Sequence, residues 1–155
     1  MITCKVWDYV SHSNDVDFQK KVEGLLLYHK VVSVRKLDSE ELDKNQVAEL
    51  VLDNGVVLKV EGNEGCGGCG NGWFYLTELN NCDNAITKVE CVIKDDEGNI
   101  VSSPSEKYDG SGDFIYNIFV FAENNKINLL QYEGGDNGYY GTGYSLYVSL
   151  FYEAI

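Results

Sequence analysis

A cysteine pair inside a glycine-rich segment is the feature of this sequence best suited to chemistry. Residues 61–73 are Glu-Gly-Asn-Glu-Gly-Cys-Gly-Gly-Cys-Gly-Asn-Gly-Trp. Glycine loses more conformational freedom on folding than any other residue. An ordered run of glycines is therefore found where the backbone must adopt positive φ, wrap a ligand or approach another backbone closely. The segment predicts a site, and its residues suit either a metal ion or a small ligand.

A metal site is suggested by the spacing of Cys66 and Cys69. In a zinc knuckle both thiolates point inward, and neighbouring glycines leave backbone N–H groups free to donate to sulfur. A closed zinc site has four ligands, and the nearest further candidate is Cys82, followed by Cys91, although these two do not form a second knuckle. The chain has five cysteines, and an odd number argues against a disulfide framework. Zinc is one alternative, and residues that only shape a tight loop are another. A thioredoxin-like redox pair is less favoured, because Gly70-Asn71-Gly72 is poor helix material. No cofactor other than zinc is expected.

The same glycines also suit a ligand whose polar groups are held by the backbone. The N–H groups of Gly67, Gly68 and Gly70 can form an anion-binding nest, and Trp73 can stack on a base. The segment is not a generic nucleotide motif, because Trp73 follows the last glycine where a Walker loop needs Lys and then Ser or Thr. The carboxylate of Glu64 suits hydrogen bonds from a sugar hydroxyl or a base edge.

A second glycine-rich segment, residues 133–144, is Glu-Gly-Gly-Asp-Asn-Gly-Tyr-Tyr-Gly-Thr-Gly-Tyr. Tyr139 and Tyr140 offer flat, amphipathic faces that stack on a ring or contact a protein partner. The alternative is an aromatic plug, with Tyr144 in the core and the glycines forming a bulge. We expect both segments to line one pocket, and the predicted ligand-binding residues are Asn63, Glu64, Gly67, Gly68, Gly70, Trp73, Tyr139, Tyr140 and Thr142.

The sequence predicts no catalytic residue. His12 and His29 are the side chains able to act as bases near neutral pH without pKa tuning, and both are expected at surface positions. The sequence contains no Gly-x-Ser-x-Gly, His-Glu-x-x-His or cytidine-deaminase pattern. Enzyme activity stays open, and binding without turnover is favoured.

Charge and hydropathy exclude several classes of partner. The formal net charge is −13 at pH 7, which disfavours direct binding to nucleic acids and to anionic membranes. The acidity favours solubility, with mimicry of DNA as the alternative. No apolar run approaches the roughly 20 residues that span a bilayer, and no signal peptide is evident, so a cytoplasmic protein is expected.

The elements that must position these segments are mostly strands. Phe18, Val22, Leu25 and Leu26 recur at helical spacing and predict one short helix. Asp53-Asn54-Gly55 predicts a hairpin, and Glu123-Asn124-Asn125 another. Further strands are predicted over 2–10, 32–37, 47–52, 56–61, 86–93, 100–101, 114–121, 127–132 and 144–150, whereas 73–79 is ambiguous between strand and helix. The whole chain, 1–155, is expected to be a single domain of mainly β (α+β) class, an antiparallel sheet or sandwich with one short N-terminal helix.

Three motifs together resemble an uncharacterised domain family of small acidic β-rich proteins encountered in the genomes of tailed bacteriophages. They are the segment 61–73, the run Cys-Asp-Asn-Ala-Ile-Thr at 82–87, and Asn-Gly-Tyr-Tyr-Gly-Thr-Gly-Tyr at 137–144. The resemblance covers roughly residues 47–148. It implies a protein expressed in the cytoplasm of an infected bacterium, and it carries no established activity or catalytic residue.

The resemblance leads us to expect a non-enzymatic phage accessory protein that counters host defence. It would sequester a small nucleotide-derived immune signal between the two glycine-rich segments, with Lys88 and Lys126 as candidate sources of positive charge. The alternatives are inhibition of a host defence protein by direct contact or DNA mimicry, hydrolysis of a phosphorylated signal, and a structural role in the virion. Exposed strand edges also suit homo-oligomerisation.

Overall fold

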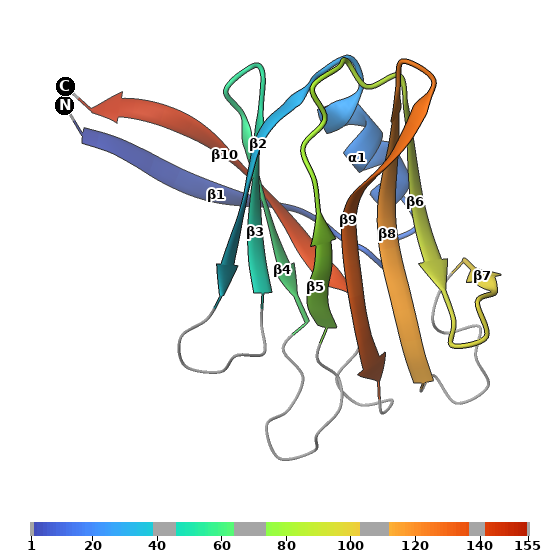
Figure 1. Cartoon of the computed structure of the whole chain (residues 1–155). Coiled ribbons are helices and arrows are strands. Elements are labelled where there is room, and N and C mark those ends of the chain that lie inside the picture. Colours follow the sequence, from blue (N-terminus) through green and yellow to red (C-terminus); the bar gives the residue numbers. More distant parts are fainter. Residues whose placement is uncertain (1, 39–45, 64–73, 103–111, 137–141, 155) are drawn as a thin grey trace.

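Two five-stranded antiparallel sheets make up the fold of the computed structural model, which describes residues 2–38, 46–63, 74–102, 112–136 and 142–154 (Figure 1). The first sheet has the strand order β1 (Ile2–His12), β10 (Tyr144–Ala154), β4 (Val57–Gly62), β3 (Gln46–Leu52) and β2 (Val31–Asp38). The second has the order β5 (Phe74–Leu79), β9 (Asn125–Asp136), β8 (Gly112–Ala122), β6 (Lys88–Lys94) and β7 (Ile100–Val101). The expected mainly β fold with one short helix is confirmed.

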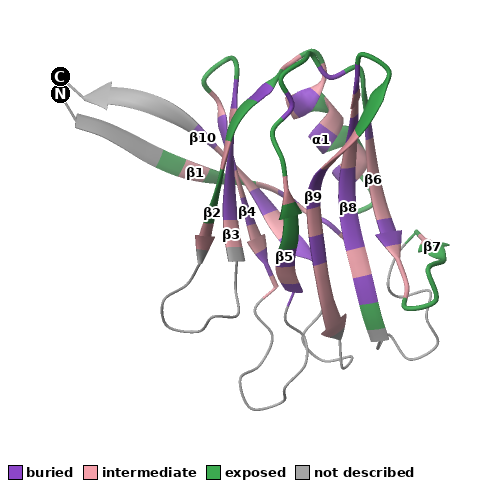
Figure 2. Cartoon of the chain, in the orientation of Figure 1, coloured by how far each residue is buried: buried purple, intermediate pink, exposed green. Residues whose placement is uncertain are grey.

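Buried aromatic side chains join the two sheets. Tyr144 of β10 stacks on Tyr132 of β9 with ring centroids 4.9 Å apart, and it meets Tyr116 of β8 edge-on at 6.1 Å. Leu58 and Val60 project from β4 into the same core, because alternate residues of a strand point to the same face. Figure 2 shows buried residues along β3, β8 and the helix, whereas β7 is largely exposed.

The single described helix, α1 (Phe18–Leu26), packs against β6 and β1. Phe18, Val22 and Leu26 are its buried residues, which confirms the predicted helical spacing. The helix ends where Leu27 becomes extended and Tyr28 adopts a left-handed φ of 70°.

A side chain from α1 covers part of the open edge of the second sheet. The short strand β7 pairs with β6 at Ile93 and Lys94 and leaves the earlier part of β6 without that neighbour. There the Gln19 Nε2 donates to the Val89 carbonyl at 2.7 Å, and the Gln19 Oε1 accepts from the Cys91 N–H at 2.7 Å. One side-chain amide thus takes the hydrogen bonds that an adjacent strand would make.

Two tight turns define one end of the fold, which we name the hairpin end. Gly55 has a φ of +85° in the turn that joins β3 to β4, and Glu123 and Asn124 have φ of 48° and 65° between β8 and β9. Both hairpins were predicted, the first because Asn-Gly tolerates positive φ, and both are confirmed. We name the opposite end, where β4 and β9 finish and β5 and β8 begin, the glycine end.

The structure also changes two expectations about strand extent. The ambiguous stretch before Leu79 is a strand, β5, that begins at Phe74. Strand β9 continues past the predicted end at Tyr132 into the second glycine-rich segment, because Gly134 pairs with both Phe74 and Phe114. Neighbouring strands on both sides therefore order residues that composition alone placed in a loop.

The outer halves of β1 and β10 form a two-stranded ribbon that projects from the body (Figure 1). Pairing between β10 and β4 ends at Ser149 and Val57, whereas pairing between β10 and β1 continues to Ala154 opposite Ile2. One backbone edge of β10 beyond Ser149 is thus without a described strand neighbour.

Candidate functional site

The ends of the two glycine-rich segments lie side by side at the glycine end. Gly62 pairs with Tyr144 across β4 and β10. The Asn63 N–H donates to the Gly143 carbonyl at 2.8 Å, and the Phe74 N–H donates to the Asn63 carbonyl at 3.0 Å. Residues that flank both segments are therefore joined by backbone hydrogen bonds.

Of the predicted ligand-binding residues, Asn63 and Thr142 belong to the described part of the chain. The others lie outside the described residues, so their roles stay predictions: Glu64, Gly67, Gly68, Gly70, Trp73, Tyr139 and Tyr140. The metal candidates Cys66 and Cys69 also lie outside it.

The Thr142 side chain is directed into the protein. The residue is 2 % exposed, and its Oγ1 accepts from the Asn14 Nδ2 at 2.9 Å. The Tyr116 hydroxyl donates to the Asn14 Oδ1 at 2.6 Å and lies 2.5 Å from the Thr142 Oγ1. Because the Tyr116 proton is used on Asn14, the Thr142 hydroxyl donates to Tyr116. The three side chains form a closed ring of hydrogen bonds, which we name the Asn14–Tyr116–Thr142 cluster.

Gly143 and Ser13 fix the segment beside this cluster. The Ser13 Oγ accepts from the Tyr144 N–H at 2.9 Å, and the Ser13 N–H donates to the Tyr144 carbonyl at 2.9 Å. Gly143 has a φ of +85°, and a Cβ at this position would lie 2.0 Å from the Ser13 Oγ. Only glycine fits this close approach. Sequence reasoning missed Ser13 and Asn14, because no spacing signal links residues so far apart in the chain.

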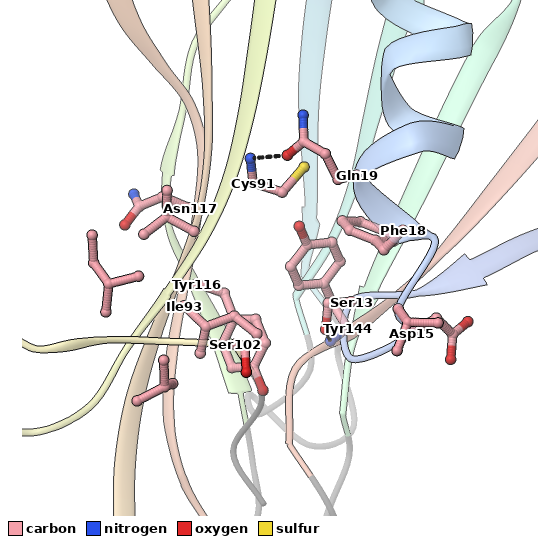
Figure 3. Close-up of a pocket in the computed structure, with 14 residues that line it drawn as sticks. Ser13, Asp15, Phe18, Gln19, Cys91, Ile93, Ser102, Tyr116, Asn117 and Tyr144 are labelled. Carbon is pink, nitrogen blue, oxygen red and sulfur yellow. Dashed lines mark hydrogen bonds between the residues drawn. The ribbon is translucent and has the colours of Figure 1, made fainter. Parts of the chain in front are cut away.

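A cavity of about 340 Å³ adjoins the cluster (Figure 3). Residues at the start of α1 form one wall, β6 and β8 form another, and Tyr144 of β10 contributes its ring. Phe18 and Ile93 supply apolar surface, and Cys91 lies on the same side as Gln19. Cys91 is partly buried and packs against the hydrophobic core.

Burial keeps the Cys91 thiol and the Tyr144 phenol of this cavity neutral. Desolvation raises the pKa of the Cys91 thiol to about 12, with a smaller contribution from the charge of Glu23. Desolvation also raises the pKa of Tyr144 well above its ordinary value, and the neighbouring Cys91 adds to that shift. Both side chains are therefore protonated throughout the physiological pH range.

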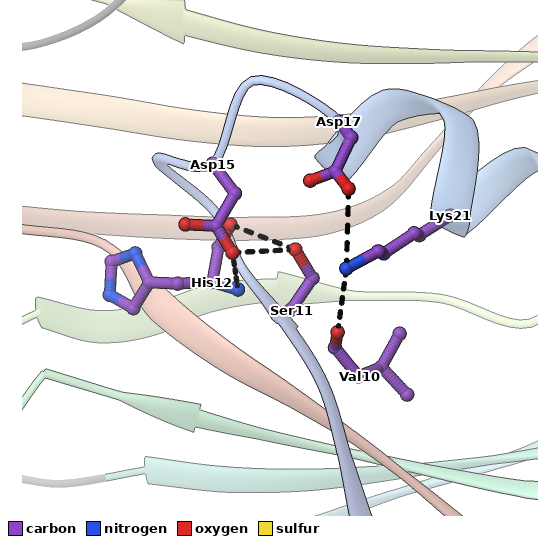
Figure 4. Close-up of polar contacts among 6 residues, drawn as sticks. All are labelled: Val10, Ser11, His12, Asp15, Asp17 and Lys21. Atoms are coloured by element: carbon purple, nitrogen blue, oxygen red, sulfur yellow. Dashed lines mark hydrogen bonds and ion pairs between the residues drawn. The ribbon is translucent and has the colours of Figure 1, made fainter.

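A group of Ser, His and Asp side chains near the start of α1 is arranged for structure (Figure 4). The Asp15 carboxylate accepts from the Ser11 hydroxyl at 2.8 Å and from the His12 backbone N–H at 2.9 Å, and these bonds lower the pKa of Asp15. The His12 Nδ1 accepts from the Asn14 N–H at 3.1 Å. In a catalytic triad the imidazole bonds to both the serine and the carboxylate, whereas here Asp15 contacts Ser11 directly.

Acidic residues gather near the glycine end, where Lys94 at the end of β6 and Lys59, which is paired with Glu61, are also described. A hollow there is lined by the carboxylates of Asp95, Asp96, Asp113 and Glu133. Lys88 and Lys126, the candidate sources of positive charge, both pair with Phe121 at the hairpin end. Along β9, Gly134 lies roughly 27 Å from Lys126, at about 3.4 Å per residue. The structure therefore does not bring these two lysines to the ends of the glycine-rich segments.

Cys82 also lies at the hairpin end. It is buried, its thiol donates to the Asn84 carbonyl at 3.3 Å, and its backbone pairs with Val31. It follows Leu79, whereas the segment that carries Cys66 and Cys69 joins β5 at the opposite end. Among the described residues, no group of three or more His, Cys, Asp or Glu side chains is placed to hold a metal ion. Nor does that part of the chain contain a helix long and apolar enough to cross a membrane.

Within the described residues, the fold and these contacts define a two-sheet antiparallel β protein with one helix at its side and with the ends of two glycine-rich segments side by side. The chain belongs to the family described as "Domain of unknown function (DUF7448)", whose model matches residues 24–146. No curated protein and no solved structure matches the chain. The match excludes β1 and the first part of α1, so the cavity wall formed by residues 13–19 lies outside the matched region.

Proposed function

We propose that the protein is a non-enzymatic binding protein that holds a small nucleotide-derived molecule at its glycine end. The observation that carries this proposal is the hydrogen bond from the Asn63 N–H to the Gly143 carbonyl at 2.8 Å. This bond joins the flanks of both glycine-rich segments, as a pocket lined by both would require.

Residue types in the two segments supply the contacts that such a ligand needs. The backbone N–H groups of Gly67, Gly68 and Gly70 would hold anionic groups. The rings of Trp73 and Tyr140 would stack on bases, with Tyr139 beside them, while Asn63 and Glu64 would bond to a sugar or a base edge. The acidic side chains nearby disfavour phosphate. Most of the binding energy would therefore come from stacking and from base and sugar contacts.

We further propose that the protein is a phage accessory protein, and that it acts in the cytoplasm of an infected bacterium by sequestering an immune signal. The family resemblance of the glycine-rich motifs supports the phage context. The structural arrangement of Ser11, His12 and Asp15 supports binding rather than turnover in the described part of the chain.

Native mass spectrometry with cyclic dinucleotides and cyclic ADP-ribose species tests this proposal. The spectra should show an intact nucleotide held at fixed stoichiometry, and Trp73→Ala and Tyr140→Ala should each abolish the bound mass. Tyr28→Ala is the matched control, because Tyr28 is 77 % exposed next to the C-terminus of α1. Appearance of a cleaved nucleotide would instead identify a hydrolase, and no bound mass would overturn the proposal.

A second candidate function is inhibition of a host defence protein by direct contact. The edge of the projecting ribbon that has no described strand neighbour favours it, because an exposed strand edge can add a strand from a partner. The same edge could pair two copies of this chain. Size-exclusion chromatography of the pure protein separates these outcomes, since only self-pairing produces a dimer without a host extract. Binding to a host enzyme that weakens steeply with salt would indicate DNA mimicry.

A further inference from the structure

We propose that the cavity between α1 and the second sheet is a separate binding site for a small, uncharged, mainly apolar molecule that carries one hydrogen-bond acceptor. The volume of about 340 Å³ falls at the lower end of the range of about 300–1,000 Å³ that is typical of ligand pockets. This site is distinct from the pocket proposed between the glycine-rich segments, and it is made of described residues.

The hydroxyl of Tyr144 is the main evidence. Tyr144 is 1 % exposed, and its hydroxyl makes no hydrogen bond within the described part of the chain. Buried polar groups in native proteins nearly always have a partner, so each exception needs an explanation. In Figure 3 the Tyr144 ring lies at the cavity with its hydroxyl directed toward the side of Cys91 and Gln19. A ligand acceptor in the cavity would provide the missing partner.

Other polar groups at the cavity already have partners. Both polar atoms of the Gln19 amide bond to the β6 backbone, and the Asn117 Nδ2 donates to Asn128 and Gln131. The Tyr116 hydroxyl belongs to the Asn14–Tyr116–Thr142 cluster. The Ser13 Oγ accepts from the Tyr144 N–H at 2.9 Å and retains its own proton. The groups left to donate to a ligand are therefore the Tyr144 hydroxyl, the Ser13 hydroxyl and the Cys91 thiol, which is a weak donor.

The charge at the rim of the cavity selects against anions. The thiol and the phenol are neutral because burial raises their pKa values. The Asp15 carboxylate, whose pKa is lowered by hydrogen bonds from His12 and Ser11, lies at the exposed rim and repels anions. Phe18 and Ile93 offer no partner to a charge. A neutral aromatic carbonyl compound fits the combination of apolar walls and the buried Tyr144 donor.

Three probes of matched size test the proposal: acetophenone, ethylbenzene and benzoate. Binding is followed in the full chain by the amide NMR signals of Cys91 and of the Gln19 side chain, which lie at the cavity. Acetophenone should shift both signals saturably, ethylbenzene should bind more weakly, and benzoate should not bind. Tyr144→Phe should weaken the affinity for acetophenone by about 10-fold, which corresponds to the loss of one hydrogen bond. The affinity for ethylbenzene should change by less than about 2-fold.

Two further variants complete the experiment. Tyr132→Phe removes a buried hydroxyl that bonds to the Val60 carbonyl away from the cavity, and it should leave acetophenone binding unchanged. Ile93→Trp fills the cavity and should abolish binding of both neutral probes. The proposal is overturned if no neutral probe shifts the two signals, or if Tyr144→Phe binds acetophenone as tightly as the parent. Trp73→Ala should not affect these probes, so failure here is distinguishable from failure of the nucleotide proposal.

Discussion

Two neighbouring tyrosines, Tyr116 and Tyr144, show how differently equally buried groups can be treated. Each is 1 % exposed, and their rings are in edge-on contact at 6.1 Å. The Tyr116 hydroxyl is enclosed by Asn14 and Thr142, whereas the Tyr144 hydroxyl faces a cavity without a described partner. Burial alone therefore does not separate a structural polar group from a recognition group. The two kinds of hydroxyl are distinguished by whether each has a hydrogen-bond partner within the protein.

Gly143→Ala should cause the largest loss of stability, because the new side chain disturbs the packing beside the Asn14–Tyr116–Thr142 cluster. The new Cβ would lie 2.0 Å from the Ser13 Oγ and 3.1 Å from the Tyr116 ring, at a φ of +85°. Left-handed strain and overpacking together should lower the free energy of unfolding by about 3 kcal/mol. Urea denaturation measures the change.

Gly55→Ala is the matched control for that variant. Gly55 also has a φ of +85°, but no atom lies within 4 Å of its added Cβ. Gly55→Ala should therefore lose about 1 kcal/mol of unfolding free energy, from backbone strain alone. Equal losses in the two variants would mean that the contact with Ser13 is unimportant.

Tyr116→Phe should have the next largest effect. It removes one member of the closed ring and leaves the Asn14 Oδ1 and the Thr142 hydroxyl with fewer partners. The expected loss of unfolding free energy is about 1–3 kcal/mol. Thr142→Val, which removes a different hydroxyl of the same ring, should produce a similar loss, and the double variant should lose less than the sum.

Tyr144→Phe tests the other hydroxyl of the comparison, the one without a described partner. The substitution removes a buried hydroxyl that has no described partner, so it should leave stability within about 0.5 kcal/mol of the parent or raise it. Thermal and urea unfolding of the ligand-free protein measure this. A loss as large as that of Tyr116→Phe would show that the hydroxyl is already satisfied in the isolated protein.

Acidification should produce the smallest change in the free energy of unfolding. Desolvation lowers the pKa of His12, and the nearby Asp15 carboxylate only partly opposes that shift. The unfolded chain therefore binds more protons than the folded chain near pH 6, so stability falls as the pH drops below about 6.5. Protonation also removes the Nδ1 acceptor used by the Asn14 N–H. His12→Asn retains an acceptor that does not titrate, and its unfolding free energy should depend less on pH in this window.

Local signals in the sequence were sufficient for the hairpins and the helix. Asp53-Asn54-Gly55 has one low-energy way to turn, and Phe18, Val22 and Leu26 repeat at the helical period. Pairing between strands that are not joined by a tight turn was not predictable, because it depends on contacts between distant segments. β1 lies beside β10 at the other end of the chain, and no local pattern encodes that choice.

Of the two candidate sites, the sequence suggested one and gave no signal for the other. Shared composition suggested that the two glycine-rich segments lie together, and the bond between Asn63 and Gly143 joins their flanks. The cavity had no such signal, since Gln19, Cys91 and Tyr144 come from three separate segments of the chain. A tyrosine in an alternating strand predicts burial but not whether its hydroxyl finds a partner.

The bond between the Gln19 side chain and β6 makes one amide proton a reporter of helix docking. In most strands an amide proton exchanges with solvent only when neighbouring strands separate. The Cys91 N–H is instead held by a side chain from α1, at 2.7 Å. Its exchange rate in deuterated water therefore measures how often α1 lifts away from the sheet. That rate should slow whenever a molecule occupying the cavity holds α1 in place.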